Sequence, residues 1–197
     1  MDDFGSLMLR GSGILLRAIE LKNANDLFLI IEESREHLER WLPWVQYVHS
    51  ISDERHIVEQ WIYEMQIRAA IHLCVLFENK ISGVISTHQI DWMNQRASIG
   101  YWIRKDMTGK NLATAATAVL MNYLFEKLRL HRIYIQAATE NEASNKVIRK
   151  LGFKLEGILR ENERVNDRFL DHNIYGMTED DFKDTKANLL QFIGQGL

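Results

Sequence analysis

The stretch ASIGYWIRKDMTGKNLATAATAVLMNYLFEKLRLHRIYIQAA, residues 97–138, decides the fold. Its first part, residues 97–103, has the branched and aromatic composition of a half-buried strand. From Leu112 onward apolar side chains recur at i, i+3, i+4 and i+7, which predicts a helix. Residues 132–138 alternate as a second strand. This strand–helix–strand unit is expected to be a right-handed crossover whose two strands lie parallel in one sheet.

The rest of the chain alternates between helix-like and strand-like stretches. Upstream, the pattern predicts a strand, two helices and two hairpin strands, over residues 14–19, 23–34, 52–70, 72–77 and 80–91. Downstream, it predicts a short helix, two strands and a terminal helix, over residues 142–151, 153–159, 169–177 and 178–193. This order indicates an α/β (α+β) fold with helices on both faces of a mixed, mostly antiparallel sheet. We expect one domain over residues 1–197, with its core at about 14–177.

Bulk properties exclude several classes of protein. The chain has 197 residues, enough for one domain with a sizeable core, and its formal net charge of −3 comes without the basic stripe of a nucleic-acid binder. The most apolar run, residues 112–125, is too short to cross a bilayer. The one cysteine, Cys74, cannot form an internal disulfide or anchor a thiolate metal site. We therefore expect a soluble cytoplasmic protein with no metal, no nucleic-acid partner and no membrane partner.

The loop between the first strand and the long helix of residues 97–138 is a candidate anion site. Residues 104–111 (RKDMTGKN) lead through Gly109 into the start of the helix. Free backbone N–H groups and the helix dipole at such a junction suit a pyrophosphate. Many loops of this kind use a glycine only to turn the chain. The residues alone leave both interpretations open.

Five motifs in the same order resemble the GNAT acetyltransferase superfamily, in its RimJ/RimL-like branch. The first to stand out is NEASNKVIRKLGF at residues 141–153, which is similar to the N-x-A-S…LGF helix of that branch. The other four are WLPW at 41–44, IGYW at 99–102, GKNLAT at 109–114, and EGILR at 156–160 followed by DH at 171–172. The resemblance covers residues 15–177. It implies a GNAT fold with a splayed central strand pair, and acetyl-CoA as the acetyl donor to a primary amine.

The resemblance also implies where the coenzyme binds. The implied coenzyme-binding residues are Trp102, Ile103, Thr108, Gly109, Lys110, Asn111, Leu112, Ala113, Thr114, Asn141 and Ser144. A backbone N–H near Ile103 is expected to face the thioester oxygen and to stabilise an oxyanion there. The family loop Q/R-x-x-G-x-G/A has Thr108 in its first position and Asn111 at its central glycine. Asn111 suits that position if its backbone is left-handed, and whether the two departures weaken coenzyme binding stays open.

Proton transfer requires a base for the amine and, to a smaller extent, an acid for the thiolate. An α-amino group has a pKa of about 7.7–8.0, whereas the pKa of a thiol is about 8.5. Many superfamily members place a tyrosine where this chain has Ile148, which cannot donate a proton. The resemblance to the RimJ/RimL-like branch implies Ser144 as the acid and Glu163 as the base.

Each of these residues also has a purely structural interpretation. Ser144 is equally well a helix-end hydroxyl that bonds the backbone, and Asn141 is a good N-cap for its helix. Glu163 lies between two arginines, as a solvated turn residue does. His88 and His172 are alternative bases, since imidazole titrates near neutral pH.

The sequence says least about the amine that accepts the acetyl group. The branch resemblance implies the N-terminal amine of a protein, with ribosomal proteins as the typical targets. A polyamine, an aminoglycoside or an amino-acid-like metabolite is the alternative within enzymes, and a non-catalytic coenzyme-binding module is the alternative outside them. Trp41 and Trp44 are candidates to line the acceptor groove or to cover the core. The apolar residues of the tail, among them Leu189 and Phe192, predict either a homodimer interface or packing on the chain's own sheet.

Overall fold

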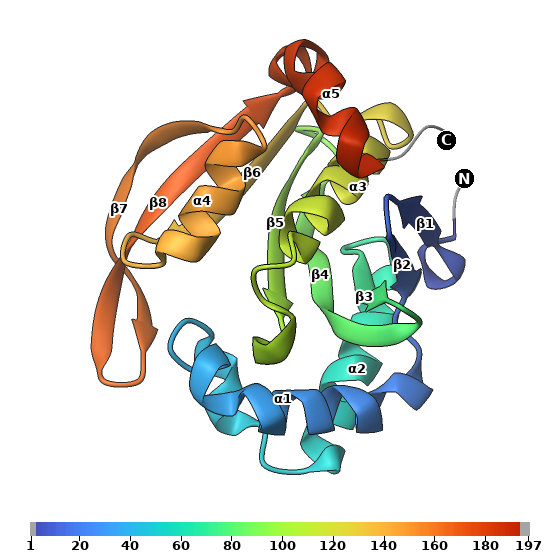
Figure 1. The fold of residues 1–197 in the computed structure, drawn as a ribbon, viewed down its shortest axis with the longest axis vertical. Helices are drawn as coiled ribbons and strands as arrows, with labels where there is room; N and C mark the ends of the chain where they lie inside the picture. Colours follow the sequence, from blue (N-terminus) through green and yellow to red (C-terminus); the bar gives the residue numbers. More distant parts are fainter. Residues whose placement is uncertain (1–2, 194–197) are drawn as a thin grey trace.

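The computed structural model describes residues 3–193, so residues 1–2 and 194–197 of the predicted domain lie outside the described part (Figure 1). Five α-helices are described, namely α1 (Ala24–Leu38), α2 (Ile51–Gln66), α3 (Leu112–Glu126), α4 (Glu142–Lys150) and α5 (Glu179–Ile193). Eight described strands accompany them, namely β1 (Met8–Gly11), β2 (Ile14–Ala18), β3 (His72–Phe77), β4 (Lys80–Asp91), β5 (Arg96–Ile103), β6 (Arg132–Ala138), β7 (Lys154–Val165) and β8 (Arg168–Thr178). No helix among them is long and apolar enough to span a membrane.

The eight strands form a single sheet in the order β1-β2-β3-β4-β5-β6-β8-β7. Each neighbouring pair is antiparallel except β5 and β6, which are parallel and joined by the crossover helix α3. The mixed, mostly antiparallel sheet is thus confirmed. Strand β1 escaped prediction because it has only four residues. It pairs with β2 through a tight turn in which Gly13 takes a positive φ of 75°.

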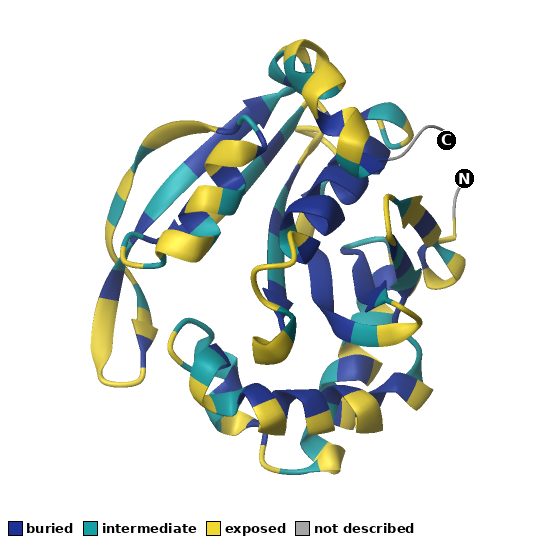
Figure 2. Cartoon of the chain, in the orientation of Figure 1, coloured by how far each residue is buried: buried dark blue, intermediate teal, exposed yellow. Residues whose placement is uncertain are grey.

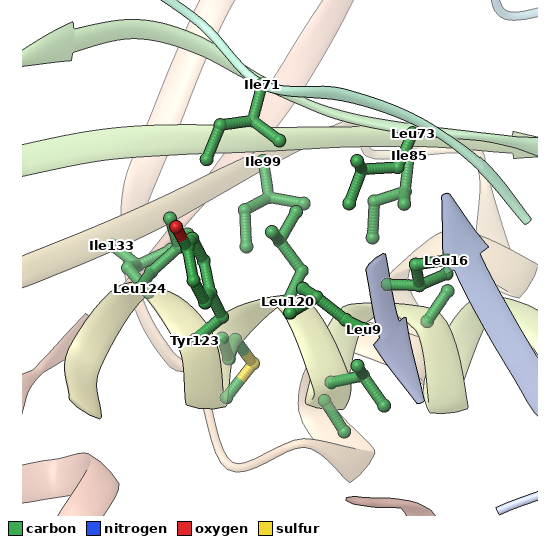
Figure 3. Packing of buried hydrophobic residues seen from close by; sticks show 14 of the residues in the cluster. Leu9, Leu16, Ile71, Leu73, Ile85, Ile99, Leu120, Tyr123, Leu124 and Ile133 are labelled. Carbon is green, nitrogen blue, oxygen red and sulfur yellow. The ribbon is translucent and has the colours of Figure 1, made fainter. Parts of the chain in front are cut away.

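Helices cover both faces of this sheet, as the alternating side chains of β3 show. Leu73 and Val75 pack into a large core with α3, α4 and α5, whereas Cys74 and Leu76 pack on the opposite face with α1 and α2. Figure 3 shows side chains of the first core, with strand residues meeting those of α3. Because α5 also covers α3, buried residues surround α3 on almost all sides, beyond the single stripe that the sequence indicated (Figure 2).

The parallel pair β5–β6 separates soon after it begins. Its register covers only three pairs, from Arg96 opposite Arg132 to Ser98 opposite Tyr134. Beyond that point β5 stays with β4 as far as Ile103, and β6 stays with β8 as far as Ala138. The two halves of the sheet therefore diverge, as Figure 1 shows for the ends of β5 and β6 nearest α1. This confirms the splayed central pair.

Several element boundaries differ from the prediction for local reasons. Helix α2 begins one residue after Ser50, whose hydroxyl accepts a hydrogen bond from the Asp53 N–H at 3.2 Å, so Ser52 is not its start. Strand β7 runs on to Val165 because a bulge between Leu159 and Glu163 shifts its register with β8 without ending the pairing. The expected cap of α5 is present, since the Asp181 N–H donates to the Thr178 hydroxyl at 3.3 Å.

Candidate active site

Two cavities meet in the space between the diverging strands. The first, of about 400 Å³, lies among β5, the start of α3, α4 and the end of α1, and the second, of about 320 Å³, lies among β4, β5, β6, β7 and β8. Five residues line both cavities, namely Trp41, Leu42, Tyr101, Asn141 and Ser144. A reactant in one cavity can therefore approach a reactant in the other at these side chains.

The first cavity brings together almost all of the residues predicted to bind a coenzyme. Those that line it are Trp102, Ile103, Thr108, Gly109, Asn111, Leu112, Ala113, Thr114, Asn141 and Ser144. Lys110 is the exception. Its ammonium lies 5.7 Å from the centre of the Phe77 ring and 3.3 Å from the Met107 sulfur, and it is not among the lining residues.

The start of α3 has the features of an anion site. Asn111 precedes it in the left-handed conformation, with φ 59° and ψ 14°, which is the condition under which asparagine can stand in for glycine. No side chain caps α3, so its first N–H groups are available to acceptor oxygens. The Lys150 ammonium on α4 donates to the Asn111 side-chain oxygen at 3.1 Å and brings a positive charge to the same place. These groups suit a diphosphate.

The edge of β5 that faces the gap presents an unpaired N–H. The Arg104 N–H donates to the Ser82 backbone carbonyl at 2.9 Å, and Ile103 lies opposite Gly83 in the register of β5 with β4. Since successive N–H groups of a strand point to opposite edges, the N–H of Ile103 points away from β4. It therefore faces the gap that β6 has left, as an oxyanion donor needs.

Ser144 lies in the first turn of α4, where both cavities meet. Its N–H donates to the Asn141 side-chain oxygen at 3.1 Å, so Asn141 is the N-cap of the helix. Its hydroxyl lies 3.0 Å from the Tyr101 hydroxyl. Burial raises the pKa of Tyr101 to about 12, against the opposing hydrogen bond with Ser144, so the phenol keeps its proton at neutral pH.

Tyr101 is a functional candidate that the sequence analysis missed. It belongs to the IGYW motif, from which only the neighbouring Trp102 was assigned to the coenzyme. Alternation along β5 was the available signal, because it places Tyr101 on the face of α4 and Trp102 on the face of α1. Ile148, which stands where many superfamily members have a tyrosine, is a fully buried residue of α4.

Glu163 reaches the second cavity because of the bulge in β7. Glu161 has a positive φ of 50°, and its N–H donates to the Asp171 carboxylate at 2.8 Å. The strand then resumes with Glu163 opposite Leu170 and lining the cavity. Burial raises the pKa of Glu163, while the nearby His172 opposes that effect. The residue is therefore a half-buried strand carboxylate, and it does not lie in a turn.

The remaining candidate residues differ in whether they line a cavity or pack in the core. Trp41 lines both cavities, whereas the Trp44 ring lies 6.4 Å from Trp102 within the core beneath α1. His88 lines the second cavity, pressed so close to Gly100 that an added Cβ there would lie 2.6 Å from the imidazole. Among residues 3–193, no cluster of histidine, cysteine or carboxylate side chains suits a metal ion.

Comparisons with known proteins agree on one family. The family described as "Acetyltransferase (GNAT) domain" matches residues 14–154. The putative ribosomal N-acetyltransferase YdaF of Bacillus subtilis is 33% identical over 174 residues, covering 88% of this chain and 95% of that protein.

Two solved structures are similar over most of their length. RimL, a ribosomal L7/L12 alpha-N-protein acetyltransferase in complex with coenzyme A, has a TM-score of 0.85 and 28% identity, over 87% of this chain and 98% of that one. The microcin C7 self-immunity acetyltransferase MccE, in complex with acetyl-CoA and AMP, has a TM-score of 0.81 and 32% identity, over 85% of this chain and 93% of that one.

Proposed function

This chain belongs to the GNAT acetyltransferase family, and from that premise we propose that it acetylates the N-terminal amine of a protein, of the ribosomal type, with acetyl-CoA as donor. The observation that carries the proposal is the meeting of two cavities at Ser144 and Tyr101. One cavity has the features that suit a long anionic donor, and the other holds a half-buried carboxylate that suits an amine. Direct transfer between two bound substrates follows from this arrangement.

The residues of the first cavity are assigned to acetyl-CoA. The N–H groups of Leu112, Ala113 and Thr114 would hold the diphosphate, with Lys150 neutralising part of its charge. The pantetheine arm would follow the exposed edge of β5. The N–H of Ile103 would then stabilise negative charge that develops on the thioester oxygen.

Glu163 is assigned as the base. An N-terminal amine arrives mostly protonated at neutral pH and has to lose a proton before it attacks. A carboxylate whose pKa is raised by burial is a better proton acceptor than an ordinary glutamate. Glu163 lines the second cavity, where the amine is expected to bind.

Ser144 and Tyr101 are assigned to the leaving sulfur. Their hydroxyls lie 3.0 Å apart, so the Tyr101 O–H can donate to the Ser144 oxygen while the Ser144 O–H donates a hydrogen bond to the departing thiolate, and neither residue is left ionised. Since a coenzyme thiol is only weakly basic, a modest donor is sufficient here. Asn141 serves mainly to hold Ser144, through the capping hydrogen bond.

The lining of the second cavity favours a monoamine over a polyamine. Among its described lining residues, Glu163 is the only carboxylate, whereas a polyamine with several charges needs several. The side chains of Gln136 and Asn162 offer hydrogen bonds to a peptide backbone instead.

A small-molecule amine attached to an aromatic base is the second candidate. Trp41 and Tyr134 line the second cavity and offer faces on which a base can stack. The solved structure of MccE holds AMP together with acetyl-CoA, which supports including an aminoacyl nucleotide in any acceptor screen.

The experiment is a thiol-release assay with acetyl-CoA and a set of amines. The set contains a ribosomal-protein N-terminal peptide, the same peptide with a blocked N-terminus, spermidine and a stable aminoacyl-nucleotide analogue. We expect release with the free peptide and none with the blocked one. Faster release with spermidine or with the nucleotide would overturn the peptide assignment. No release with any amine would indicate a coenzyme-binding module without turnover.

A further inference from the structure

His172 occupies a position that the proposed mechanism does not use. It lies on β8 with only 8% of its surface exposed, beside the cavity that holds Glu163. Both of its ring nitrogens have partners. Nδ1 is 3.1 Å from the Asn162 side-chain nitrogen, and Nε2 is 3.6 Å from a carboxylate oxygen of Glu163.

The partner of Nδ1 determines where the imidazole carries its proton. The Asn162 amide nitrogen can only donate, so Nδ1 accepts and the proton lies on Nε2. The same amide nitrogen lies 3.2 Å from the side-chain oxygen of Gln136 on β6. A chain of contacts thus runs from β6 through β7 to β8, and it ends with the protonated Nε2 within ion-pair distance of the Glu163 carboxylate.

We propose that His172 is a positioning residue, whose Nε2–H holds the Glu163 carboxylate toward the incoming amine while Asn162 and Gln136 fix the ring. The inference rests on the proposed role of Glu163 as the base. His172 is not itself the base in this arrangement, because neither ring nitrogen has a free lone pair facing the cavity.

Glu163 needs such a partner for a physical reason. Glu163 follows the bulge in β7, and its side chain is 38% exposed. The side chain has three rotatable bonds, so the carboxylate can adopt many orientations. Among the described residues, His172 is the only basic side chain within ion-pair distance of it. The other titratable groups that line the cavity are His88 on β4, Tyr101 on β5 and Tyr134 on β6.

The test compares the pH dependence of kcat/KM for the acceptor in three proteins, namely the wild type, His172→Phe and Glu163→Gln. Phenylalanine keeps the buried ring but removes both nitrogens. Without the Nε2–H, nothing opposes the effect of burial, which raises the pKa of Glu163. The acidic limb of the kcat/KM profile is therefore expected to move up by about 0.5 to 1 pH unit. We also expect kcat to fall about 5- to 20-fold. KM for acetyl-CoA is expected to stay unchanged, because the coenzyme residues lie in the other cavity.

Two further variants keep the test valid if the phenylalanine protein does not fold. His172→Gln restores an N–H donor and is expected to recover part of the shift. Asn162→Ala removes the partner of Nδ1 without altering the buried ring, and a smaller shift in the same direction is expected. His56→Gln is the control, because this histidine is exposed on α2 and lines neither cavity, so its acidic limb should match the wild type.

The outcomes separate the two assignments. If Glu163→Gln retains the full rate and the acidic limb, Glu163 is not the base, and the role of His172 falls with it. If Glu163→Gln loses the limb while the limbs of His172→Phe, His172→Gln and Asn162→Ala match the wild type, the base assignment stands and the positioning role is overturned.

Discussion

The Tyr101 hydroxyl is the single group whose removal tests the acid side of the mechanism with the smallest disturbance. Tyr101→Phe keeps the ring and deletes the oxygen that lies 3.0 Å from the Ser144 hydroxyl. If the two hydroxyls act as one unit, we expect kcat to fall about 10- to 100-fold, with little change in KM for acetyl-CoA. Steady-state kinetics of the two single variants and the double variant Tyr101→Phe/Ser144→Ala provide the measurement.

If the two hydroxyls share one role, the losses in activation free energy should not add, because removing either hydroxyl already abolishes the function of the pair. The double variant should then be no slower than the slower single variant. Independent losses that multiply, or a wild-type rate for Tyr101→Phe, would exclude the pairing.

Glu54 is a second residue whose environment makes a measurable prediction, this time about stability. It lies in the first turn of α2 with no exposed surface, and neither carboxylate oxygen has a hydrogen-bond partner in the described structure. Burial raises the pKa of Glu54 from 4.5 to about 8. Below about pH 4.5 the group is protonated in both the folded and the unfolded chain. Between that pH and about 8 the unfolded chain alone ionises, so the free energy of unfolding falls as pH rises.

Glu54→Gln removes this titration. Relative to the wild type, the variant is expected to gain about 2–4 kcal/mol in free energy of unfolding between pH 5 and pH 8. Denaturant unfolding at several pH values measures the difference. Glu59→Gln is the control on the same helix, because the exposed Glu59 carboxylate is paired with Arg55. A difference between Glu54→Gln and the wild type that does not change with pH would contradict the prediction.

At the scale of elements, α4 links the coenzyme loop to the sheet. Its buried Asn145 donates to the Ala138 carbonyl and accepts from the Tyr175 hydroxyl, both at 2.8 Å, so the helix is tied to β6 and β8. One turn later, Lys150 reaches Asn111 at the start of α3, and its ammonium lies 5.2 Å from the centre of the Phe192 ring on α5. Three helices therefore converge where the diphosphate is expected.

Lys150→Gln tests whether this convergence serves the coenzyme. Losing the ammonium is expected to weaken acetyl-CoA binding about 5- to 20-fold, as is typical for a charged hydrogen bond of about 1–2 kcal/mol. Calorimetry with coenzyme A and with its 3′-dephospho form distinguishes the phosphate involved. An equal loss for both ligands supports the diphosphate. A loss confined to coenzyme A assigns Lys150 to the 3′-phosphate, and no loss at all removes it from the site.

The sequence predicted the elements better than their ends. The stripe of α3 and the alternation of β6 were strong signals because their period is set by burial on one face. The bulge in β7 had no such signal, because it depends on Asp171, on the neighbouring strand, which accepts the Glu161 N–H. The bulge is also what directs Glu163 into the cavity, so its final position depended on tertiary structure.

At the scale of the whole molecule, the sheet diverges after three residue pairs and leaves room for two substrates. Sequence reasoning anticipated the divergence and nearly all of the first cavity through the resemblance of its motifs. It did not find Tyr101 as a partner of Ser144 or the contact of His172 with Glu163. Both depend on side chains that are far apart in the chain, and periodicity carries no information about such pairs.

The most direct test of the central claim is a crystal structure with coenzyme A and a peptide that has a free N-terminus. We expect the diphosphate at the first N–H groups of α3, the sulfur beside the Ser144 hydroxyl, and the peptide amine beside Glu163. A coenzyme bound outside the first cavity, or β5 and β6 paired onward through Tyr101 with the gap closed, would contradict it.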